Sequence, residues 1–201
     1  MLRVALTGGL ASGKSFVGRA LADLGCFLIR NDELGHQVIE PGGEAYADTV
    51  REFGTGILNA DGTIDRRKLG TLVFHDPERL AKLNALVHPP VRARTRRMLE
   101  EYGEDHPHGI AVVEAAIMVE TGSYRNYAKL IVAVCGLEQQ MERALARGGI
   151  TREEVLERLS RQMPLEEKLK YADYVIDTSG AKENTLAHVR AVYGALLALD
   201  Q

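Results

Sequence analysis

The sequence has only two cysteines, Cys26 and Cys135, among its 201 residues. Their spacing matches neither a CxxC redox motif nor a set of metal ligands, and two cysteines do not make the disulfide framework of a small secreted domain. Each cysteine stands in an apolar stretch of the sequence. We therefore expect two buried thiols in a reducing compartment, and we predict a cytoplasmic protein.

Long hydrophobic runs and a strong excess of charge are also missing. No run approaches the roughly 20 apolar residues that cross a bilayer, and the N-terminus lacks the pattern of a secretory signal. The formal net charge of −3 disfavours bulk binding to nucleic acid. Hydrophobic residues at 45% and charged residues at 26% are typical of a globular domain. We expect neither a membrane nor a nucleic acid as a partner, and a monomer or weak homo-oligomer.

Five short apolar runs alternate with helical patterns along the chain. This alternation predicts a parallel β-sheet that is covered by helices on both faces, and hence a three-layer α/β fold with a five-stranded sheet. The last helix is expected over about 182–199. The expected strands are Leu2–Leu6, Cys26–Ile29, Ile110–Val113, Leu130–Val134 and Tyr174–Ile176.

The uneven spacing of these strands predicts two insertions. About 80 residues separate the second run from the third, more than one crossover helix needs, so this stretch is expected to form a helical lobe. Within it, Asn59–Gly62 predicts a turn, Asp76-Pro77 predicts the start of a helix, and His88-Pro89-Pro90 predicts its end. The second insertion is rich in charges, and Thr151 and Glu154 have capping-box spacing. We divide the single domain into a core (about 1–30, 108–137 and 171–201), a helical lobe (about 31–107) and a lid (about 138–170).

The segment Gly8–Ser15 reads GGLASGKS and matches the phosphate-loop motif GxxxxGK[ST]. Glycines let successive backbone N–H groups turn toward a phosphate, and the following helix adds the positive end of its dipole. Lys14 can reach the β and γ phosphates, and the Ser15 hydroxyl can ligate Mg²⁺. Because the motif joins a predicted strand to a predicted helix, we predict a site for ATP with Mg²⁺. The expected ATP-binding residues of this loop are Gly8, Ala11, Ser12, Gly13, Lys14, Ser15 and Phe16.

Several classes of nucleotide-binding protein share this motif. The chain is too short for a motor, and it lacks the NKxD run with which switch proteins read guanine. A small-molecule kinase needs an acceptor lobe, a carboxylate near the acceptor hydroxyl, and an arginine-bearing lid that excludes water. The two insertions fit the lobe and the lid, although most arginines in such a charged run are simply solvated. The candidate lid arginines are Arg143, Arg147, Arg152, Arg158 and Arg161.

The candidate carboxylate is Asp32, which follows the second predicted strand. Residues at the carboxyl ends of parallel strands face the ligand crevice of an α/β sheet. Asp32 could therefore orient the proton of an attacking hydroxyl, or it could simply cap a helix that begins near Glu33. His88 could likewise contact a ligand or be a structural histidine.

Further motifs extend this pattern over almost the whole chain, and together they resemble the dephospho-CoA kinase family. The phosphate loop is similar to the family's LTGGIGSGKS, and the lid carries its QxxRxxxR pattern. The resemblance rests on Leu6–Ser15, Ala22–Gly25, Asp32, Val38–Gly42, Asp61–Leu69, Leu83, Asn84, His88, Pro89, Glu120, Gln140, Arg143, Arg147, Gln162 and Ala172–Asp177.

The resemblance implies ATP-dependent phosphorylation of the ribose 3′-hydroxyl of dephospho-CoA, the last step of coenzyme A biosynthesis. It implies that Asp32 is the carboxylate at the acceptor hydroxyl, and that Lys14 and Arg143 are also catalytic. It adds Arg147 to the residues that contact ATP. The residues expected to bind dephospho-CoA are Asp32, Arg66, His88 and Glu120.

The chain also departs from the family pattern. Arg30 and Asn31 replace the first two residues of a DAD motif, and Glu114 replaces an aspartate. Ala116 stands at the proline of PLL, and Thr178 stands at the asparagine of VIDN. Two alternatives to the implied activity are a kinase for another small acceptor and an ATP-binding module that has lost catalysis. Only Arg30 encourages the second of these.

Overall fold

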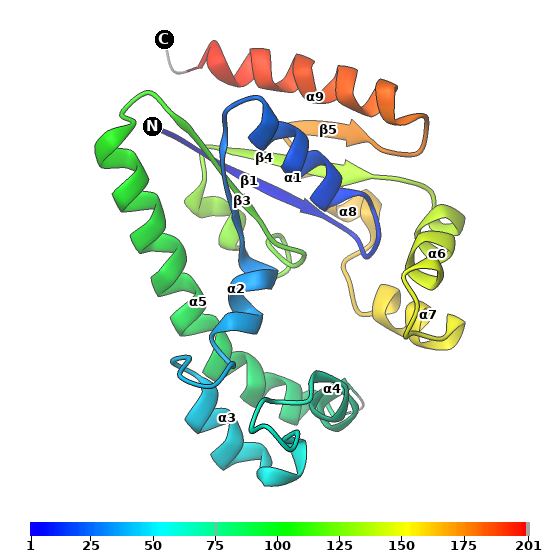
Figure 1. Ribbon diagram of the computed structural model, residues 1–201. Helices are drawn as coiled ribbons and strands as arrows, with labels where there is room; N and C mark the ends of the chain where they lie inside the picture. The colour runs from blue at the N-terminus through cyan, green and yellow to red at the C-terminus, as the bar shows by residue number, and fades with distance from the viewer. Residues whose placement is uncertain (75, 200–201) are drawn as a thin grey trace. The chain divides into compact units, whose positions relative to one another are not determined.

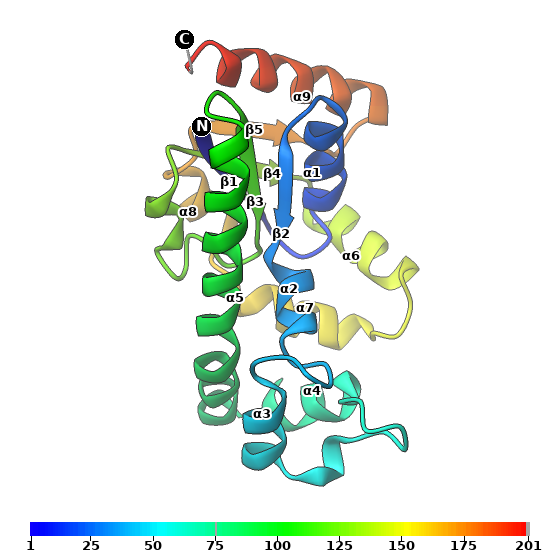
Figure 2. The same cartoon turned by 60° about the vertical axis from the view of Figure 1, so that its left-hand side comes forward.

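The computed structural model describes residues 1–74 and 76–199, and of Phe74 it describes only the backbone. Its elements form two compact units, Met1–Arg30 with Glu101–Gln201 and Asn31–Glu100. Figures 1 and 2 draw the chain in two views. Residues 200–201 of the predicted core lie outside the described residues. The functional division into core, lobe and lid stays a prediction.

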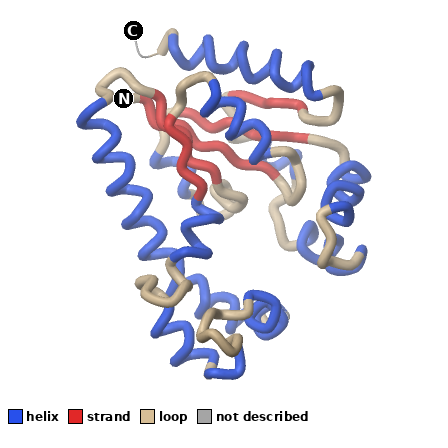
Figure 3. Tube along the Cα trace, in the orientation of Figure 1, coloured by secondary structure: helices blue, strands red, loops and turns tan. Residues whose placement is uncertain are grey.

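The first unit contains a five-stranded sheet. All neighbouring strands are parallel, and their order is β2-β3-β1-β4-β5. Figure 3 shows these strands in red among the helices. The predicted α/β fold with a five-stranded parallel sheet is therefore confirmed. The strands are β1 (Leu2–Gly8), β2 (Phe27–Arg30), β3 (Ile110–Glu114), β4 (Lys129–Val134) and β5 (Tyr174–Asp177).

The sheet forms from these segments because they are nearly continuous apolar runs. Leu6 and Thr7 of the central strand β1 point to opposite faces of the sheet and are both completely buried, as expected of a strand that is covered on both faces. Parallel strands end at the same edge of a sheet, so the register there brings strand ends together. Glu114, the last residue of β3, pairs with Leu6 on one side and with Arg30, the last residue of β2, on the other.

Two long helices cover one face of the sheet. Helix α1 (Lys14–Asp23) and helix α9 (Lys182–Leu197) lie side by side in both Figure 1 and Figure 2. Val17 of α1 and Val189 of α9 belong to the same buried cluster as Leu6 of β1. This cluster fixes α1, and with it the loop that precedes α1, on the central strands.

Residues from the C-terminal half of the chain cover the other face of the sheet. Thr7 of β1 and Lys168 of helix α8 (Leu165–Leu169) both donate to the carbonyl oxygen of Ala116. Because side chains alternate along a strand, Thr7 points away from the α1 face to which Leu6 points. The helices that precede α8 are α6 (Leu137–Ala146) and α7 (Arg152–Ser160). The predicted capping box of α7 is confirmed, with Thr151 and Glu154 bonding each other's backbone N–H.

Both cysteines belong to the interior of the first unit. Cys26 and Cys135 are buried free thiols, which confirms the expectation of two buried thiols. Burial raises the pKa of Cys26 to about 12. Burial is also the main reason why the pKa of Cys135 is raised. Both side chains are therefore packing residues that stay protonated at neutral pH.

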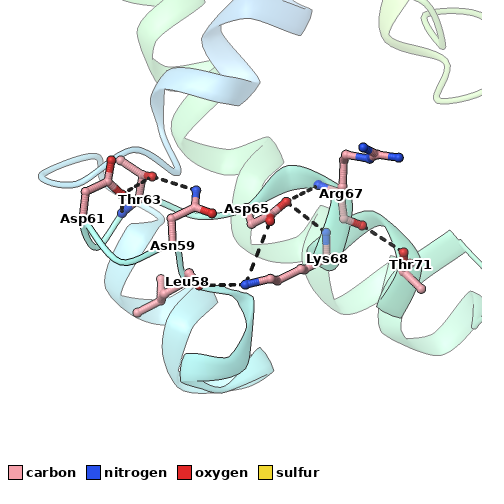
Figure 4. Close-up of polar contacts among 8 residues, drawn as sticks. All are labelled: Leu58, Asn59, Asp61, Thr63, Asp65, Arg67, Lys68 and Thr71. Atoms are coloured by element: carbon pink, nitrogen blue, oxygen red, sulfur yellow. Dashed lines mark hydrogen bonds and ion pairs between the residues drawn. The ribbon is translucent and has the colours of Figure 1, made fainter. Parts of the chain in front are cut away.

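The second unit is built from short helices and one long one. The predicted turn is confirmed, since Gly62 has a φ of +83° and its N–H donates to the carbonyl of Asn59. Asp65 then starts the next helix by accepting hydrogen bonds from the backbone N–H groups of Arg67 and Lys68 at 2.9 and 3.2 Å (Figure 4). The elements are α2 (Asn31–Gln37), α3 (Tyr46–Phe53), η1 (Thr55–Ile57), α4 (Arg66–Phe74) and most of α5 (Pro77–Asp105).

Helix α5 begins as predicted, but it does not end where we expected. Asp76 Oδ1 accepts from the N–H groups of Glu78 and Arg79, both at 3.0 Å. The prediction that Pro89 and Pro90 break the helix is wrong, because α5 continues through both. Two missing N–H groups are tolerated because the following turns bury Val91, Thr95 and Leu99 at successive i, i+4 positions. Although α5 has 29 residues, no helix in the described part of the chain is long and apolar enough to cross a membrane.

Candidate active site

The phosphate-loop motif forms the turn between β1 and α1 (Figure 1). The Ser12 N–H donates to the carbonyl of Gly9 at 3.1 Å, and the Phe16 N–H donates to the carbonyl of Gly13 at 2.9 Å. Among the described residues no side chain caps the start of α1, and its first turn carries no acidic residue. The N-terminal end of α1 therefore presents backbone donors and a positive dipole to an anion.

The loop holds a conformation that few residue types adopt. Gly13 has a φ of +83°, and Ala11 is the one non-glycine among the described residues with a positive φ, at +54°. Gly8 lies so close to its neighbours that a Cβ there would clash with Ser12 Oγ and would approach the Ala133 carbonyl oxygen to 2.7 Å. A left-handed alanine is strained, and such strain is common where a loop is shaped for a ligand.

Glu114 gathers the charged side chains at the carboxyl edge of the sheet. Its Oε1 accepts a hydrogen bond from Ser15 Oγ at 2.6 Å and lies 3.3 Å from Lys14 Nζ. Its Oε2 lies 3.7 Å from Arg30 Nε. The Glu114 side chain is only 4% exposed, so two cations surround a buried carboxylate. Arg30, a departure from the family pattern, therefore pairs with the same carboxylate as Lys14.

The cluster needs a glycine in α1. An ideal Cβ at Gly18 would lie 2.9 Å from Glu114 Oε2 and 3.3 Å from Leu28 Cδ1. Glycine inside a helix is normally unfavourable by about 1 kcal/mol relative to alanine. Here the missing side chain makes room for the carboxylate that bonds Ser15.

The predicted lid segment packs onto the phosphate loop. Met141 and Ala144 of α6 and Val155 of α7 form a buried cluster with Ala11. Gln162, which follows α7, accepts a hydrogen bond from the Leu10 N–H at 2.9 Å. Gln162 of the predicted lid thus bonds the Leu10 amide of the phosphate loop directly.

The two arginines of the QxxRxxxR pattern lie one turn apart at the C-terminal end of α6. Arg143 donates from Nη1 to Thr178 Oγ1 at 3.1 Å and from Nη2 to the Thr178 carbonyl at 2.6 Å. Arg147 directly follows the last residue of α6 and is exposed. Because they are four residues apart, both arginines lie on the same side of the helix. Arg143 thereby reaches the strand end beside the phosphate loop, since Thr178 Oγ1 also donates to the Ser12 carbonyl at 2.7 Å.

Glu120 has a buried partner. Lys168 Nζ lies 2.8 Å from Glu120 Oε1, and the Lys168 side chain is only 1% exposed. The same oxygen accepts from the Met163 N–H at 3.1 Å. Glu120 thus joins the segment after β3 to the segment that leads into α8. Its expected contact with dephospho-CoA stays a prediction.

The other residues expected to bind dephospho-CoA belong to the second unit. Asp32 is exposed in the first turn of α2, which begins at Asn31, so the helix start expected near Glu33 was two residues late. Burial and the charge of Arg66 lower the pKa of His36, while the charge of Asp32 acts in the opposite direction. Arg66 and Asp32 therefore both lie within electrostatic reach of one imidazole. His88, on α5, is half-buried.

Some residues of this arrangement carry no signal in the sequence. Lys168 resembles any other lysine in a charged helix, and His36 is a single histidine. Glu114 and Thr178 stood out only as departures from a motif, and nothing in the sequence indicated what they contact. The alternation of apolar residues in β3 places Glu114 on a definite face, but its partners depend on the register between strands.

Comparisons with known proteins agree over nearly the whole chain. A family model described as dephospho-CoA kinase matches residues 2–184. The dephospho-CoA kinase of Aquifex aeolicus is 41% identical over 196 residues, which cover 98% of this chain and 98% of the relative. The dephospho-CoA kinase of Geobacillus kaustophilus is 39% identical over 202 residues, covering 100% and 99% of the two chains.

Solved structures give the same result. A crystal structure of the Thermus thermophilus protein TT1252 matches with a TM-score of 0.78 and 33% identity, covering 97% of both chains. A structure of dephospho-CoA kinase from Campylobacter jejuni matches with a TM-score of 0.71 and 26% identity, covering 99% of this chain and 98% of that one. Sequence and fold therefore point to one family.

Proposed function

We propose that this chain, which belongs to the dephospho-CoA kinase family, transfers a phosphoryl group to the ribose 3′-hydroxyl of dephospho-CoA. The reaction of the family is the ATP-dependent phosphorylation of dephospho-CoA in coenzyme A biosynthesis. The observation that carries the activity is the match of the family over residues 2–184, which includes the phosphate loop. We further propose a cytoplasmic enzyme that is a monomer or weak homo-oligomer. The two buried free thiols support a reducing compartment.

The phosphate loop is the proposed site of the ATP phosphates. Backbone N–H groups of the loop, other than those of Leu10, Ser12 and Phe16, would bind phosphate oxygens at the N-terminal end of α1, and Lys14 would pair with the β and γ phosphates. Lys14 already lies 3.3 Å from Glu114 Oε1, so its ammonium group is held near the loop before the nucleotide arrives. Binding of ATP exchanges part of this interaction for a charge-assisted contact to phosphate.

Mg²⁺ fits the donor set beside the loop. The ion prefers oxygen ligands and usually takes most of them from water and substrate phosphates. Ser15 Oγ and the Glu114 carboxylate provide oxygens, and Glu114 Oε2 is buried with no hydrogen bond from any described residue. No group of three or more His, Cys, Asp or Glu among the described residues could hold a metal ion, so phosphates would complete the site. Bound there, Mg²⁺ would neutralise charge that develops on the phosphates.

The remaining proposed roles concern the transferred phosphoryl group and its acceptor. Because phosphoryl transfer passes through a loose transition state, positioning and electrostatics supply most of the catalysis. Asp32 would orient the acceptor hydroxyl and receive its proton late. Arg143 and Arg147 would bind phosphate oxygens as the transfer proceeds. Arg66 and His88 would bind dephospho-CoA. Arg66 and Asp32 both shift the pKa of His36, which supports placing Arg66 near Asp32.

The alternatives to this activity gain no support. The matched family and relatives are dephospho-CoA kinases, and none favours another acceptor. The idea of an ATP-binding module that has lost catalysis rested on Arg30 alone. Arg30 is the ion-pair partner of Glu114, so its charge does not argue against catalysis.

An assay of ADP release with dephospho-CoA as acceptor tests the proposal. We expect turnover far above the background measured with ATP alone. Replacing Asp32 by asparagine should lower kcat by about 10²- to 10⁴-fold with little change in ATP affinity, because the carboxylate acts on the acceptor and not on the nucleotide.

The matched control is Glu33→Gln, which removes the neighbouring exposed carboxylate of the same helix turn. This variant should keep nearly normal turnover. Near-normal kcat in Asp32→Asn would remove Asp32 from the mechanism, whereas no turnover in the unchanged protein would refute the activity itself.

A further inference from the structure

Thr178, the residue directly after β5, places one hydroxyl among three segments of the first unit. The side chain is buried, with 5% of the residue exposed. Its Oγ1 lies 2.7 Å from the Ser12 carbonyl oxygen in the phosphate loop and 3.1 Å from the Val134 carbonyl oxygen at the end of β4. Arg143 of α6 donates to the same hydroxyl at 3.1 Å. Thr178 therefore touches the phosphate loop and the predicted lid at once.

The hydrogen-bond inventory of a hydroxyl decides how these contacts are shared. A threonine hydroxyl has a single proton to donate and can accept two hydrogen bonds. The Val134 carbonyl already accepts from the Thr178 N–H at 2.8 Å, whereas the Ser12 carbonyl is closer to the hydroxyl. The proton is therefore directed to Ser12, and a lone pair is left for Arg143. The bond to the Ser12 carbonyl and the bond from Arg143 can exist together because the hydroxyl oxygen of Thr178 both donates and accepts a hydrogen bond.

The bond to Ser12 sets the direction of a phosphate-loop amide. In a planar trans peptide, the C=O of one residue and the N–H of the next point in opposite directions. Holding the Ser12 carbonyl against Thr178 therefore turns the Gly13 N–H away from Thr178. Gly13 is packed closely here, since a Cβ at this residue would lie 2.8 Å from Thr178 Oγ1. The hydroxyl thus fixes a peptide that has a left-handed glycine, with a φ of +83°.

The bonds from Arg143 set the position of the lid arginine. Its Nη1 and Nη2 contact the hydroxyl and the carbonyl of the same residue, at 3.1 and 2.6 Å. A guanidinium group held at two points loses most of its rotational freedom, so it does not have to be ordered during the reaction. Thr178 consequently links the shape of the loop, through its hydroxyl, to the place of the arginine, through its hydroxyl and its carbonyl oxygen.

We propose that Thr178 is a positioning residue that orients the Ser12–Gly13 peptide toward the ATP phosphates and holds Arg143 beside them. The inference rests on the proposed function for the role of Arg143, but its effect on ATP binding does not depend on the acceptor. The family pattern has asparagine at this position, so the proposed role belongs to the threonine of this chain.

The test compares variants that keep or remove the hydroxyl. Thr178→Val preserves the shape of the side chain, and Thr178→Ala provides a second variant without the hydroxyl in case the first folds poorly. Loss of a buried hydrogen bond that orients the loop should weaken equilibrium ATP binding by about tenfold. Thr178→Ser keeps the hydroxyl and should restore the affinity to within about twofold of the unchanged protein.

Thr185 offers a matched control in the same region. It is also a buried threonine, with 2% of the residue exposed, and its hydroxyl donates to the Asp177 carbonyl at 3.0 Å and not to a residue of the phosphate loop. Thr185→Val should lower the melting temperature about as much as Thr178→Val while leaving ATP affinity unchanged. Equal ATP affinities in the Thr178 and Thr185 variants would overturn the proposal and leave a purely structural threonine.

A double-mutant cycle tests the link to Arg143. If Thr178 acts through the arginine, the loss of kcat caused by Thr178→Val should largely vanish in an Arg143→Ala background. Full additivity of the two losses would overturn this part of the inference. ATP affinity is measured without dephospho-CoA. Unchanged ATP affinity in the Thr178 variants is therefore a different result from a lack of phosphorylation of dephospho-CoA by the unchanged protein.

Discussion

At the scale of single residues, Glu114 brings charged and polar side chains together beside the phosphate loop. Ser15, Lys14 and Arg30 all lie within 4 Å of its carboxylate, and Gly18 leaves the space that the carboxylate fills. Removing any one of these partners would leave a buried charge less well compensated. Arg30, at the end of β2, is held by the same carboxylate that Ser15 and Lys14 contact.

A substitution at Gly18 tests this packing. Alanine in place of glycine usually stabilises a helix, but here the added Cβ would lie 2.9 Å from a carboxylate that Ser15 and Lys14 hold in place. We expect Gly18→Ala to lower the free energy of unfolding by about 1–3 kcal/mol in urea titrations.

The control for this experiment is Gly194 of α9, where an added Cβ meets nothing within 4 Å. Gly194→Ala should raise stability by about 0.5–1 kcal/mol. Glu114→Asp shortens the side chain, so Gly18→Ala should be tolerated in that background. A stabilising Gly18→Ala in the unchanged background would contradict the described contact.

His88 should contribute to the pH dependence of stability. Burial, and to a lesser degree the charge of Arg92, lower the pKa of His88 below its ordinary value of 6.5. The unfolded chain therefore takes up the proton first as the pH falls below about 6.5, and stability present above that pH is lost. His88→Gln should make the free energy of unfolding fall less steeply between pH 7.5 and 5.5. Parallel curves for the two proteins would show that His88 is not desolvated.

Single residues differ in how far the sequence predicts them. The phosphate loop is predictable because its function depends on backbone amides and on glycines at fixed spacing, all within one segment. The contacts of Glu114 are not, because they join residues from β2, β3 and α1 that are far apart in the chain. Asp32 lies between these cases, since its place after β2 was predicted while its role stays a proposal.

At the scale of elements, the Glu120–Lys168 pair connects two segments of the first unit. Lys168 reaches Glu120 at 2.8 Å and the Ala116 carbonyl at 3.3 Å. A buried ammonium between two oxygens is stable only as long as its partners remain. The pair therefore fixes α8, and the segment that precedes it, to the residues that follow β3.

Removing the lysine should be costly. We expect Lys168→Met to lower the free energy of unfolding by about 3–5 kcal/mol, because Glu120 would keep a charge with its main partner gone. Lys170→Met is the control, since Lys170 is 64% exposed and its pair with Glu167 should contribute less than about 1 kcal/mol. Adding Glu120→Gln to Lys168→Met should recover much of the loss. Equal, small effects of both lysine substitutions would refute the buried pair.

Elements follow from the sequence where their signals are local. The strands are apolar runs, and the start of α5 and the capping box of α7 depend on residues two or three positions apart. The length of α5 does not follow from local signals, because the packing of Val91, Thr95 and Leu99 outweighs the two prolines. Local rules therefore predicted helix starts better than helix ends.

At the scale of the whole molecule, two lines of observation agree on the family. Curated relatives near 40% identity cover almost the entire chain, and a parallel sheet with a phosphate loop between its central strand and the next helix is typical of a nucleotide-binding α/β fold. The departures at Arg30, Glu114 and Thr178 form contacts with their surroundings and leave Lys14, Ser15 and Asp32 unchanged. The central claim for the whole molecule is that the γ-phosphoryl group of ATP is transferred to dephospho-CoA.

The position of the transferred phosphate tests this claim most directly. The protein would be incubated with dephospho-CoA and ATP labelled at the γ phosphate, and the product analysed by mass spectrometry and phosphorus–proton NMR. We predict one added phosphoryl group, carrying the label, on the ribose 3′-oxygen. Label found only in inorganic phosphate, or on any other atom of the acceptor, would contradict the account.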